Sequence, residues 1–406
     1  MELLPRTASY DDGRLTVGGV ALADVAAEFG TPVFVFDEQG LRETAREYVR
    51  EFTSRHPRTE VHFASKALPC APVTRILAEE GVGCDVAGNG ELAIALKAGF
   101  DPEKILLHGN AKSDEDIADA VEAGVGLMVI DNADDVARLK RLAPASQKVL
   151  VRINPDVPGD THASVSTGGK EDKFGVPLEQ APALLDEAGS AFSLEGLHVH
   201  IGSQLLTLGG FARAAEAIAS LGSFPTYDLG GGLGIAYRDE LVPSIAEYAQ
   251  ATVEALLQHL GDAELIVEPG RSMVGRSGVT LYDVTTVKRH AVTHVAVNGG
   301  MGDNLEPMLY GTVFTPRILD ADRPDEICDV VGRHCESGDL LVRGATLATP
   351  RVGDTLLMPA TGAYCYSLQN NYNGARKPPV VIVNGGEARL AVRRETLSDL
   401  TARDCC

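Results

Sequence analysis

The 406-residue sequence lacks several features that would place it in common classes of protein. Its seven cysteines form an odd, scattered set without a CxxC pair, which argues against a disulfide framework and against a zinc site. No apolar stretch approaches the ~20 residues that span a bilayer, and the initial MELLPRTASYDDGR has no basic region followed by an apolar run. Cys405 and Cys406 follow TARD, which is neither polybasic nor part of a CaaX motif, so we interpret them as an ordinary tail. We therefore expect a cytoplasmic protein without a membrane partner.

Positive charge is also scarce, since 57 Asp and Glu residues outnumber 36 Lys and Arg residues and give a formal charge of −21. Such a chain repels nucleic acid, and we expect no nucleic-acid partner. Apolar residues make up 44% of the chain, which is enough for a large core. A chain of this length exceeds one ordinary domain, so two domains are expected.

Short apolar runs alternate with stretches of helical periodicity from about residue 31 to residue 270. This alternation is typical of repeated βα units, and amphipathic stretches that end at glycine, such as NGELAIALKAG and SDEDIADAVEAG, favour a barrel. After residue 275, Val/Thr-rich runs and glycine turns indicate a mostly antiparallel β domain. We predict an α/β fold with a (β/α)8 barrel over residues 31–275 and a β domain over 276–406, to which residues 1–30 add strands.

Nine apolar runs compete for the eight strand positions of the barrel, so one of them lies elsewhere or is misread. They are PVFVF (32–36), VHFAS (61–65), VGCDVA (82–87), KILLHG (104–109), GLMVID (126–131), KVLVRIN (148–154), LEGLHVHIG (194–202), TYDLG (226–230) and ELIVEPG (264–270). Catalytic groups of such a barrel lie at the C-terminal ends of the strands. The polar residues that close these runs are therefore the first candidates.

Lys66 closes the second run, and strand alternation places it on one face with His62 and Ala64. A lysine there points into the barrel mouth, where a desolvated pocket can tune its amine for a Schiff base. The alternative is a lysine that snorkels at a strand end. His198 and His200 close LEGLHVHIG and face the same way. Three interpretations of the histidines stay open: a metal pair, although no HExxH motif supports one, a ring stacked on a flat cofactor, and a buried structural histidine.

Two further motifs follow the last two runs. The segment DLGGGLG, residues 228–234, can direct several backbone N–H groups at a phosphate, although its spacing does not match the GxGxxG pattern of nicotinamide-binding turns and a tight turn is the alternative. The segment EPGR places Glu268 near Arg271, and such a carboxylate can keep a pyridine nitrogen protonated unless the two form only a structural ion pair. Together with Lys66, these motifs indicate a pyridoxal-phosphate site.

Motifs along almost the whole chain resemble those of the diaminopimelate decarboxylases and their fold-type III relatives. In order they are FASKA, HGNAKSDEDI, STGGKEDKFG, HVHIGSQ, DLGGGLGIAY, EPGRSMVG, NGGMGDN, LYG, CESGD and TGAYCYSLQNNYN. HIGSQ, EPGR and CESGD in that order are highly specific as a set. The resemblance implies a decarboxylase that uses pyridoxal 5'-phosphate, has an amino acid as its small-molecule substrate, and forms a homodimer in which both subunits complete each active site.

The resemblance also implies roles for individual residues. In the barrel, Lys66 would form the Schiff base, His200 would stack on the ring, Glu268 would pair with the ring nitrogen, and Ser203, Gly232, Gly270 and Arg271 would surround the phosphate or substrate. In the β domain, Tyr364 would contact the phosphate, and Cys335 and Glu336 would reach into the partner's site, where Cys335 would donate a proton. The substrate-binding set would be Arg271, Glu306, Tyr310, Glu336 and Tyr364, and no metal is expected.

Glu306 departs from the pattern of the family it resembles. Diaminopimelate decarboxylases usually carry arginine at this place in the run DNLEPMLYG, where it helps to hold the distal carboxylate. A carboxylate instead of the cation reverses a contact worth roughly 1 to 3 kcal/mol and adds repulsion. We predict that the distal group of the substrate differs from that of meso-diaminopimelate, unless Glu306 points to solvent and another basic group serves.

Other functions stay open at this point. The first is conversion of meso-diaminopimelate to L-lysine, and the second is decarboxylation of a related or conjugated amino acid in specialised metabolism. A pyridoxal-phosphate racemase on a similar barrel normally lacks CESGD, and a non-catalytic homologue would not need the intact Lys66, His200, Glu268 and Cys335. The residues therefore favour a decarboxylase over these two alternatives.

Overall fold

The computed structural model describes residues 3–157, 169 and 172–405. The chain divides into a β unit, residues 1–43, 236–240 and 274–406, and a barrel unit, residues 44–235 and 241–273. Cys406 and residues 166–168, 170 and 171 of the block STGGKEDKFG lie outside the described residues.

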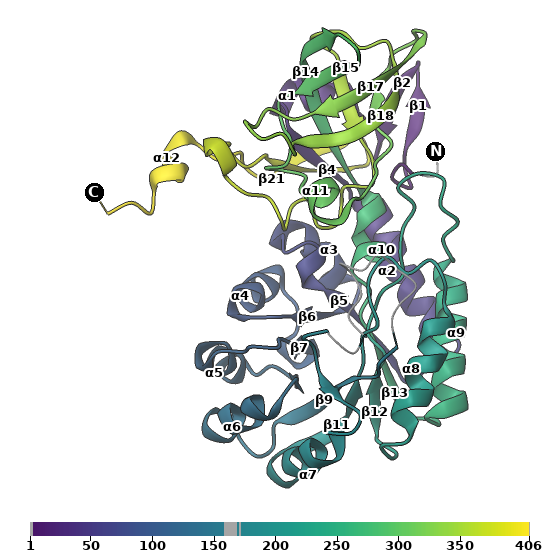
Figure 1. Cartoon of the computed structure of the whole chain (residues 1–406), viewed down its shortest axis with the longest axis vertical. Helices are drawn as coiled ribbons and strands as arrows, with labels where there is room; N and C mark the ends of the chain where they lie inside the picture. Colours follow the sequence, from purple (N-terminus) through teal and green to yellow (C-terminus); the bar gives the residue numbers. More distant parts are fainter. Residues whose placement is uncertain (1–2, 158–168, 170–171, 406) are drawn as a thin grey trace. The chain divides into compact units, whose positions relative to one another are not determined.

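Eight parallel strands close into a barrel in the barrel unit, as Figure 1 shows. They are β5 (Thr59–Ala64), β6 (Gly83–Val86), β7 (Ile105–Leu107), β8 (Leu127–Ile130), β9 (Lys148–Asn154), β11 (Ser193–His198), β12 (Thr226–Asp228) and β13 (Glu264–Val267). Pairing of β13 with β5 and of β8 with β9 completes the ring, and the two-residue β10 (Val176–Pro177) adds to β9. The predicted barrel fold is confirmed.

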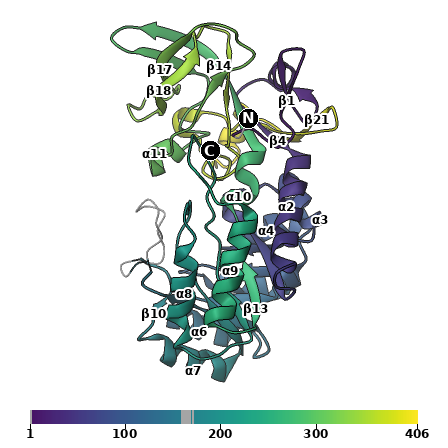
Figure 2. The same cartoon turned by 90° about the vertical axis from the view of Figure 1, so that its right-hand side faces the viewer.

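Helices follow the barrel strands and cover their outer side. They are α3 (Ala71–Glu79), α4 (Asn89–Ala98), α5 (Asp114–Ala123), α6 (Ala133–Leu142), α7 (Ala181–Ala191), α8 (Gly209–Ala219), α9 (Ile245–His259) and the short α10 (Arg271–Val274). Figure 2 shows α8 and α9 side by side in front of β13. Helix α2 (Glu38–Thr53) precedes the first barrel strand, and its Tyr48 and Phe52 pack against Tyr248 of α9 with ring centroids 6.4 and 5.4 Å apart.

Local signals explain where these helices begin and end. Ser113 and Asp116 form a reciprocal capping box at the start of α5. Gly99 and Gly124 adopt left-handed conformations, with φ of 95° and 74°, directly after α4 and α5. The predicted glycine ends of these two helices are confirmed.

The β unit contains a nine-stranded, mostly antiparallel sheet and a small three-stranded sheet. The larger sheet consists of β4 (Val33–Asp37), β14 (Gly278–Arg289), β15 (Thr293–Val297), β16 (Arg317–Ile318), β17 (Asp325–Val331), β18 (Leu340–Ala348), β19 (Thr355–Met358), β20 (Val380–Asn384) and β21 (Glu387–Val392). The smaller sheet consists of β1 (Ser9–Asp11), β2 (Arg14–Val17) and β3 (Val20–Ala21). The helices are α1 (Leu22–Phe29), α11 (Glu306–Tyr310) and α12 (Leu397–Thr401).

The ninth apolar run, PVFVF, lies outside the barrel. It forms β4, which pairs with β14 and β20 and is buried along its whole length. Its Val33 and Val35 belong to the same core as Val279 and Val381. A strand that is buried on both faces has a continuous apolar sequence both in a barrel and in the larger sheet of the β unit. The strands with which it pairs therefore decide to which sheet it belongs. The boundary between the units therefore follows residue 43 rather than residue 30, and the first strands form their own small sheet.

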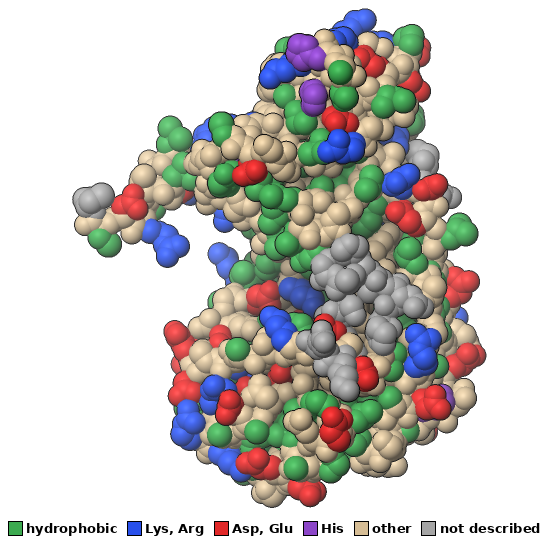
Figure 3. Space-filling model, in the orientation of Figure 1, with side chains coloured by type: hydrophobic (Ala, Val, Ile, Leu, Met, Phe, Trp, Pro, Cys, Tyr) green, Lys and Arg blue, Asp and Glu red, His purple; other side chains and the backbone are tan. Residues whose placement is uncertain are grey.

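Acidic and basic side chains are interspersed over the face of the barrel unit shown in Figure 3.

Among the described residues, no helix is both long enough and apolar enough to cross a membrane.

Candidate active site

The carboxyl ends of the barrel strands bring buried charged side chains into one layer. Because β11 pairs with both β9 and β12, His198 lies level with Arg152 on one side and with Asp228 on the other. Glu268 follows β13 directly, and His108 follows β7. All five side chains belong to residues that are less than 9% exposed. This is the end of the barrel at which active sites of this fold lie.

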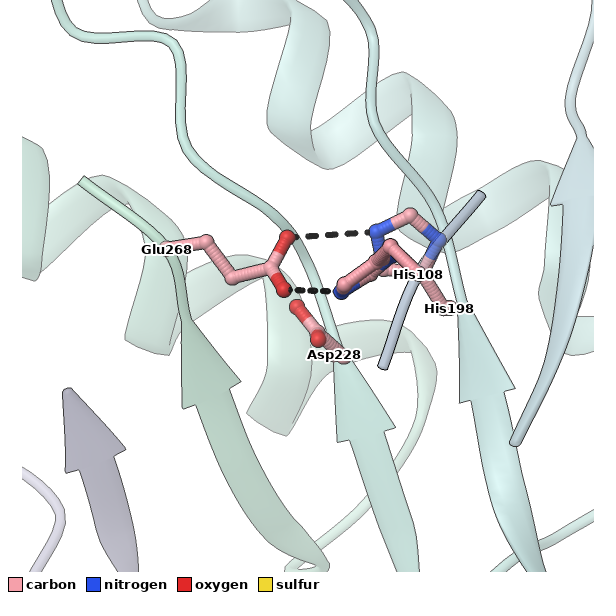
Figure 4. A group of neighbouring side chains, drawn as sticks. All are labelled: His108, His198, Asp228 and Glu268. Atoms are coloured by element: carbon pink, nitrogen blue, oxygen red, sulfur yellow. Dashed lines mark hydrogen bonds and ion pairs between the residues drawn. The ribbon is translucent and has the colours of Figure 1, made fainter. Parts of the chain in front are cut away.

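Glu268 is the centre of this cluster, as Figure 4 shows. His108 Nε2 lies 2.5 Å from Glu268 Oε1, and His198 Nε2 lies 3.3 Å from Glu268 Oε2. The two imidazole rings meet edge to face, with centroids 4.8 Å apart. Asp228 lies beside the carboxylate, and its Oδ1 accepts a 2.8 Å hydrogen bond from the N–H of Gly230. The cluster thus joins the ends of four strands through one carboxylate.

The pKa values in the cluster show where its charge resides. Burial by itself would raise the pKa of Glu268, but the charge of His108 and the hydrogen bonds of His108 and His198 outweigh it and hold that pKa well below its usual value. Burial and then the neighbouring Glu268 raise the pKa of Asp228 well above the usual range. Burial lowers the pKa of His198 to about 3. Near pH 7 the cluster therefore holds an ionised Glu268 and a neutral His198, and Asp228 keeps its proton to a higher pH than an ordinary carboxyl group does.

Lys66 lies in a single 3₁₀ turn, Ser65–Ala67, that follows β5. The expectation that it continues the strand is wrong, because the N–H of Leu68 bonds to the carbonyl of Ser65 at 2.9 Å and closes the turn. Burial first, and then the positive charge of Lys66, lowers the pKa of His200 well below its usual value. Burial and the charge of Glu268 raise the pKa of Asp85 to about 7, and the positive charges of His108 and Lys66 oppose this rise. The lysine is therefore electrostatically coupled to both neighbours.

Gly270 explains how the end of β13 comes close to the turn that carries the lysine. A Cβ atom at this position would lie 3.0 Å from Ala64 Cβ and 3.3 Å from Ala67 Cβ. Such contacts are tighter than most side chains tolerate, so glycine allows the two strand ends to approach. The next residue, Arg271, is buried, and its Nε donates a 3.4 Å hydrogen bond to Ser203 Oγ. EPGR and HIGSQ, far apart in the sequence, thus meet in the barrel.

The glycine run holds His200 and leaves two N–H groups for a ligand. Gly231 N–H lies 3.3 Å from His200 Nδ1, which accepts its hydrogen bond. A Cβ atom at position 231 would lie only 2.0 Å from the carbonyl oxygen of Glu268, so only glycine fits there. The N–H groups of Gly230 and Gly234 also bond to the protein. Of the described N–H groups in the run 230–234, those of residues 232 and 233 thus remain for an anion, which agrees with the expected place of Gly232.

This set of groups fits pyridoxal phosphate. Lys66 supplies an amine at a strand end, Glu268 supplies a buried anion for a ring nitrogen, and the glycine run supplies N–H groups for a phosphate. A site in which Glu268 were protonated, or in which a side chain filled the glycine run, would not fit. The assignments of Lys66, His200, Ser203, Gly232, Glu268, Gly270 and Arg271 to the cofactor remain predictions.

A metal ion is the other ligand that these side chains suggest. Ligand atoms of His108, His198, Asp228 and Glu268 lie within 4.8 Å of one another, and all four residues are buried. His200, the second member of the histidine pair considered from the sequence, is not part of this group. The contacts of Glu268 with the two histidines have the lengths and partners of hydrogen bonds. The absence of a metal stays a prediction.

The sequence analysis assigned no role to three residues of this layer. His108, Asp85 and Arg152 lie at or near the ends of the runs KILLHG, VGCDVA and KVLVRIN. The rule that a polar residue closing a barrel strand faces the active site applies to all three runs. A charged or aromatic residue at each strand end is the sequence signal that identifies them.

In the β unit, Glu306 is buried at the start of α11, with 0% of its surface exposed. Thr312 Oγ1 donates a 2.8 Å hydrogen bond to Glu306 Oε2. The alternative in which Glu306 turns to solvent is therefore wrong. Tyr310, at the end of the same helix, is half-buried.

The CESGD segment lies against α11 in the same unit. Cys335 and Glu336 are exposed, and a Cβ atom at Gly338 would lie 3.1 Å from Met308 Cε of α11. The segment is held by the buried Asp339, which accepts hydrogen bonds of 2.7 Å from the N–H of Met301 and of 2.8 Å from both N–H and Nδ1 of His334. Tyr364 is half-buried and adopts a left-handed φ of 63°. The β unit thus brings the predicted Cys335, Glu336, Glu306 and Tyr310 to one region, and Asp339 is the organising residue that the sequence analysis missed.

The chain is similar to known proteins over nearly its whole length. Residues 41–275 match the family model described as pyridoxal-dependent decarboxylase, pyridoxal binding domain. The diaminopimelate decarboxylase of Actinosynnema pretiosum is 42% identical over 425 residues, which cover 99% of this chain and 95% of that protein. That of Mycobacterium tuberculosis is 40% identical over 432 residues, which cover 98% and 96%.

Solved structures agree with the curated relatives. The diaminopimelate decarboxylase of M. jannaschii in complex with L-lysine superposes with a TM-score of 0.93 at 31% identity, over 99% of this chain and 98% of that one. The Helicobacter pylori enzyme, also with L-lysine, gives a TM-score of 0.88 at 30% identity over 94% and 98%.

Proposed function

We propose that this chain, which belongs to the diaminopimelate decarboxylases, acts on an α-amino acid whose distal group is not a free carboxylate. The diaminopimelate decarboxylases are a family of pyridoxal-phosphate-dependent carboxy-lyases. The enzyme class and the cofactor follow from the family, and the racemase and the non-catalytic homologue have no support among these relatives. The distal group follows from one observation, the buried Glu306.

Glu306 has the wrong charge to bind a carboxylate. Its side chain is buried and receives the hydroxyl of Thr312. Although no surface of Glu306 is exposed, a substrate carboxylate bound beside α11 would meet repulsion from this carboxylate through a region where water screens charge poorly. A neutral or cationic distal group would not meet this repulsion.

The test compares meso-diaminopimelate with its distal carboxamide and with lysine. We expect wild type to prefer one of the latter two in kcat/KM by about 10- to 100-fold, and Glu306→Arg to shift preference toward meso-diaminopimelate by a similar factor. Glu387→Arg, the same charge change on an exposed strand of the same unit, is the matched control. Wild-type turnover of meso-diaminopimelate at or above that of the other two compounds would overturn the proposal.

A second candidate substrate is meso-diaminopimelate itself, with L-lysine as product. It is favoured by the 40–42% identity to enzymes of that name over nearly the whole chain. In this case Glu306→Arg would leave the preference for meso-diaminopimelate unchanged. Decarboxylation of a conjugated amino acid in specialised metabolism is a form of the first proposal.

Each predicted site residue has a role in this proposal. Bound pyridoxal phosphate supplies an electron sink for the electron pair left by CO₂. Lys66 would carry the cofactor, Glu268 would hold an anion for its ring nitrogen, and His200 would bind the ring. Ser203, Gly232, Gly270, Arg271 and Tyr364 would hold the phosphate or the substrate, and Tyr310 and Glu336 would bind the substrate. The thiol of Cys335 delivers the proton that replaces the carboxyl group.

We further propose that the enzyme is a homodimer whose subunits share active sites. The exposure of Cys335 and Glu336 on the β unit supports this arrangement, because residues that serve a partner must be accessible. The test mixes inactive Lys66→Ala and Cys335→Ala subunits. Random exchange should restore about a quarter of wild-type activity, since half of the dimers would carry one intact site. No recovery after demonstrated subunit exchange would contradict the arrangement. The cytoplasmic location stays a prediction.

A further inference from the structure

Glu268 receives more hydrogen-bond donors than pairing with a ring nitrogen would require. His108 Nε2 is 2.5 Å from one carboxylate oxygen, and His198 Nε2 is 3.3 Å from the other. The carboxylate is 6% exposed and His198 is 1% exposed, so water does little to stabilise the charge. The protein's own donors must therefore stabilise the anion.

A buried carboxylate and a pyridine nitrogen share one proton, and two arrangements compete for it. In the neutral arrangement the acid keeps the proton, and burial favours it because no charge is created in a region of low dielectric constant. In the ionic arrangement the ring nitrogen carries the proton. Hydrogen bonds donated to the carboxylate favour this second arrangement, because they stabilise the anion and not the acid.

We propose that His108 is a positioning residue that decides this competition: by donating Nε2–H to Glu268, it keeps the carboxylate ionised and the proton on the ring nitrogen of the cofactor. The inference rests on the proposed role of Glu268 and deepens it. His108 opens the motif HGNAKSDEDI, but neither the sequence-based predictions nor the proposed reaction gives it a role.

The surroundings of His108 fit a fixed donor. Its backbone N–H bonds to the carbonyl of Val86 at 2.7 Å, which ties the end of β7 to β6. Lys112 Nζ donates a 2.6 Å hydrogen bond to the carbonyl of Gly109 and forms a 2.7 Å ion pair with Asp135. The side chains of both ion-pair partners are fully buried. The residue after His108 is therefore anchored, and the ring cannot easily leave its carboxylate.

His198 and Asp228 assist but cannot replace His108. His198 is the more distant donor, and Asp228, whose Oδ1 accepts the N–H of Gly230, already hydrogen-bonds to Glu268 in the presence of His108. The nearest positive charges, Lys66 and Arg152, also act on other carboxylates of the cluster. Loss of His108 thus removes the shortest contact to Glu268 without a substitute among these groups.

The experiment reads the ring nitrogen directly, by nitrogen-15 NMR of the holoenzyme loaded with ring-labelled pyridoxal phosphate. Wild type should show a protonated ring nitrogen. His108→Leu, which removes the donor, should shift the resonance toward that of a neutral pyridine. His108→Gln, whose amide N–H can take the place of Nε2–H, should restore the wild-type resonance. His108→Asn, which is too short to reach Glu268, replaces the leucine variant if that one does not fold.

Kinetics and a second histidine provide the controls. We expect kcat to fall about 10- to 100-fold in His108→Leu, with KM changed by less than about threefold and recovery in His108→Gln. His62 is the matched control, because it is a buried barrel histidine whose Nε2 lies 2.9 Å from another carboxylate, Glu60. His62→Leu should leave the nitrogen resonance unchanged.

Three outcomes would overturn the inference. If Glu268→Gln shifts the resonance and folded His108→Leu and His108→Asn do not, the role of His108 fails while that of Glu268 stands. If Glu268→Gln does not shift it either, the proposed cofactor contact itself fails. A stoichiometric divalent metal in the holoenzyme, lost in His108→Leu, would assign the four residues to a metal instead.

Discussion

The two ends of the barrel both carry charged side chains, but they differ in burial. At the carboxyl ends of the strands most of the charged residues are less than 9% exposed, and Lys66, in the turn that follows β5, is an exposed exception; the buried ones include Asp85, His108, Arg152, His198, Asp228 and Glu268. At the amino ends a cavity of about 800 Å³ is lined by exposed or half-buried charged residues; they include Arg58, Glu60, Glu103, Lys148, Glu195 and Glu264. The same strands thus begin in solvated charge and end in desolvated charge.

This difference shows why chemistry concentrates at one end. Exposed charges are screened by water and contribute little to one another. Buried charges interact strongly, so burial shifts the pKa of Asp85 to about 7 and that of His198 to about 3. At the amino ends of the strands, by contrast, the hydrogen bond from His62 lowers the pKa of the exposed Glu60. Four predictions test this contrast, and three of them include a control substitution.

The largest difference in activity is expected between variants of two lysines that lie at opposite ends of the barrel strands. Lys66→Ala should lower kcat/KM by roughly 10⁴-fold or more, as expected when a covalent catalytic group is lost, and should remove the visible absorbance of the bound cofactor. Lys148→Ala, at the start of β9, should leave both unchanged. An absorbance band that survives in Lys66→Ala would place the cofactor on another residue.

The next effect concerns stability at the carboxyl ends. Asp135→Ala leaves Lys112 buried without its carboxylate and should lower the free energy of unfolding by about 3 to 5 kcal/mol in urea titrations. Lys140→Ala breaks a pair with Glu187 in which both side chains are more than 40% exposed, and should cost less than about 1 kcal/mol. Equal losses in the two variants would mean that burial does not separate these ion pairs.

A smaller effect should depend on pH. Burial, and then the charge of Glu268, raises the pKa of Asp85 to about 7, so the folded protein keeps a proton that the unfolded chain releases between about pH 4 and pH 7. This carboxyl group therefore reduces stability as the pH rises through that window. Asp85→Asn removes the dependence, and its stability relative to wild type should improve by about 2 to 3 kcal/mol between pH 5 and pH 8 in the cofactor-free protein.

Glu60→Gln serves as the control for this pH dependence. The pKa of Glu60 is lowered, so its contribution to stability is lost only as the pH falls below the ordinary carboxyl range. No change is expected between pH 5 and pH 8. A flat pH dependence for Asp85→Asn relative to wild type would show that Asp85 is already ionised at pH 5.

The smallest effect is expected at the amino ends. Glu264 is exposed at the start of β13 and accepts only a 3.3 Å hydrogen bond from Thr226. Glu264→Ala should change the free energy of unfolding by less than about 0.5 kcal/mol and leave kcat/KM unchanged. A loss of activity in this variant would give the amino-end cavity a function that its exposed charges do not suggest.

Much of the fold could be predicted, because strand runs and helix ends are local signals. The eight barrel runs and the glycines after α4 and α5 are examples. β4 could not be placed, since VFVF is equally suited to a barrel strand and to the centre of the other sheet. Lys66 was singled out correctly as a strand-end residue, but the 3₁₀ turn that carries it depends on a hydrogen bond that alternation does not reveal.

The sequence by itself determined the chemical inventory and its order along the chain: a lysine after one strand, a glycine run after another, and a carboxylate after the last. These features follow from local pattern, because a strand and the polar residue that closes it are neighbours in sequence. Tertiary structure decided their charge states. The donors of Glu268 lie 160 and 70 residues away, and only closure of the barrel brings His108 and His198 to that carboxylate and removes water from all three.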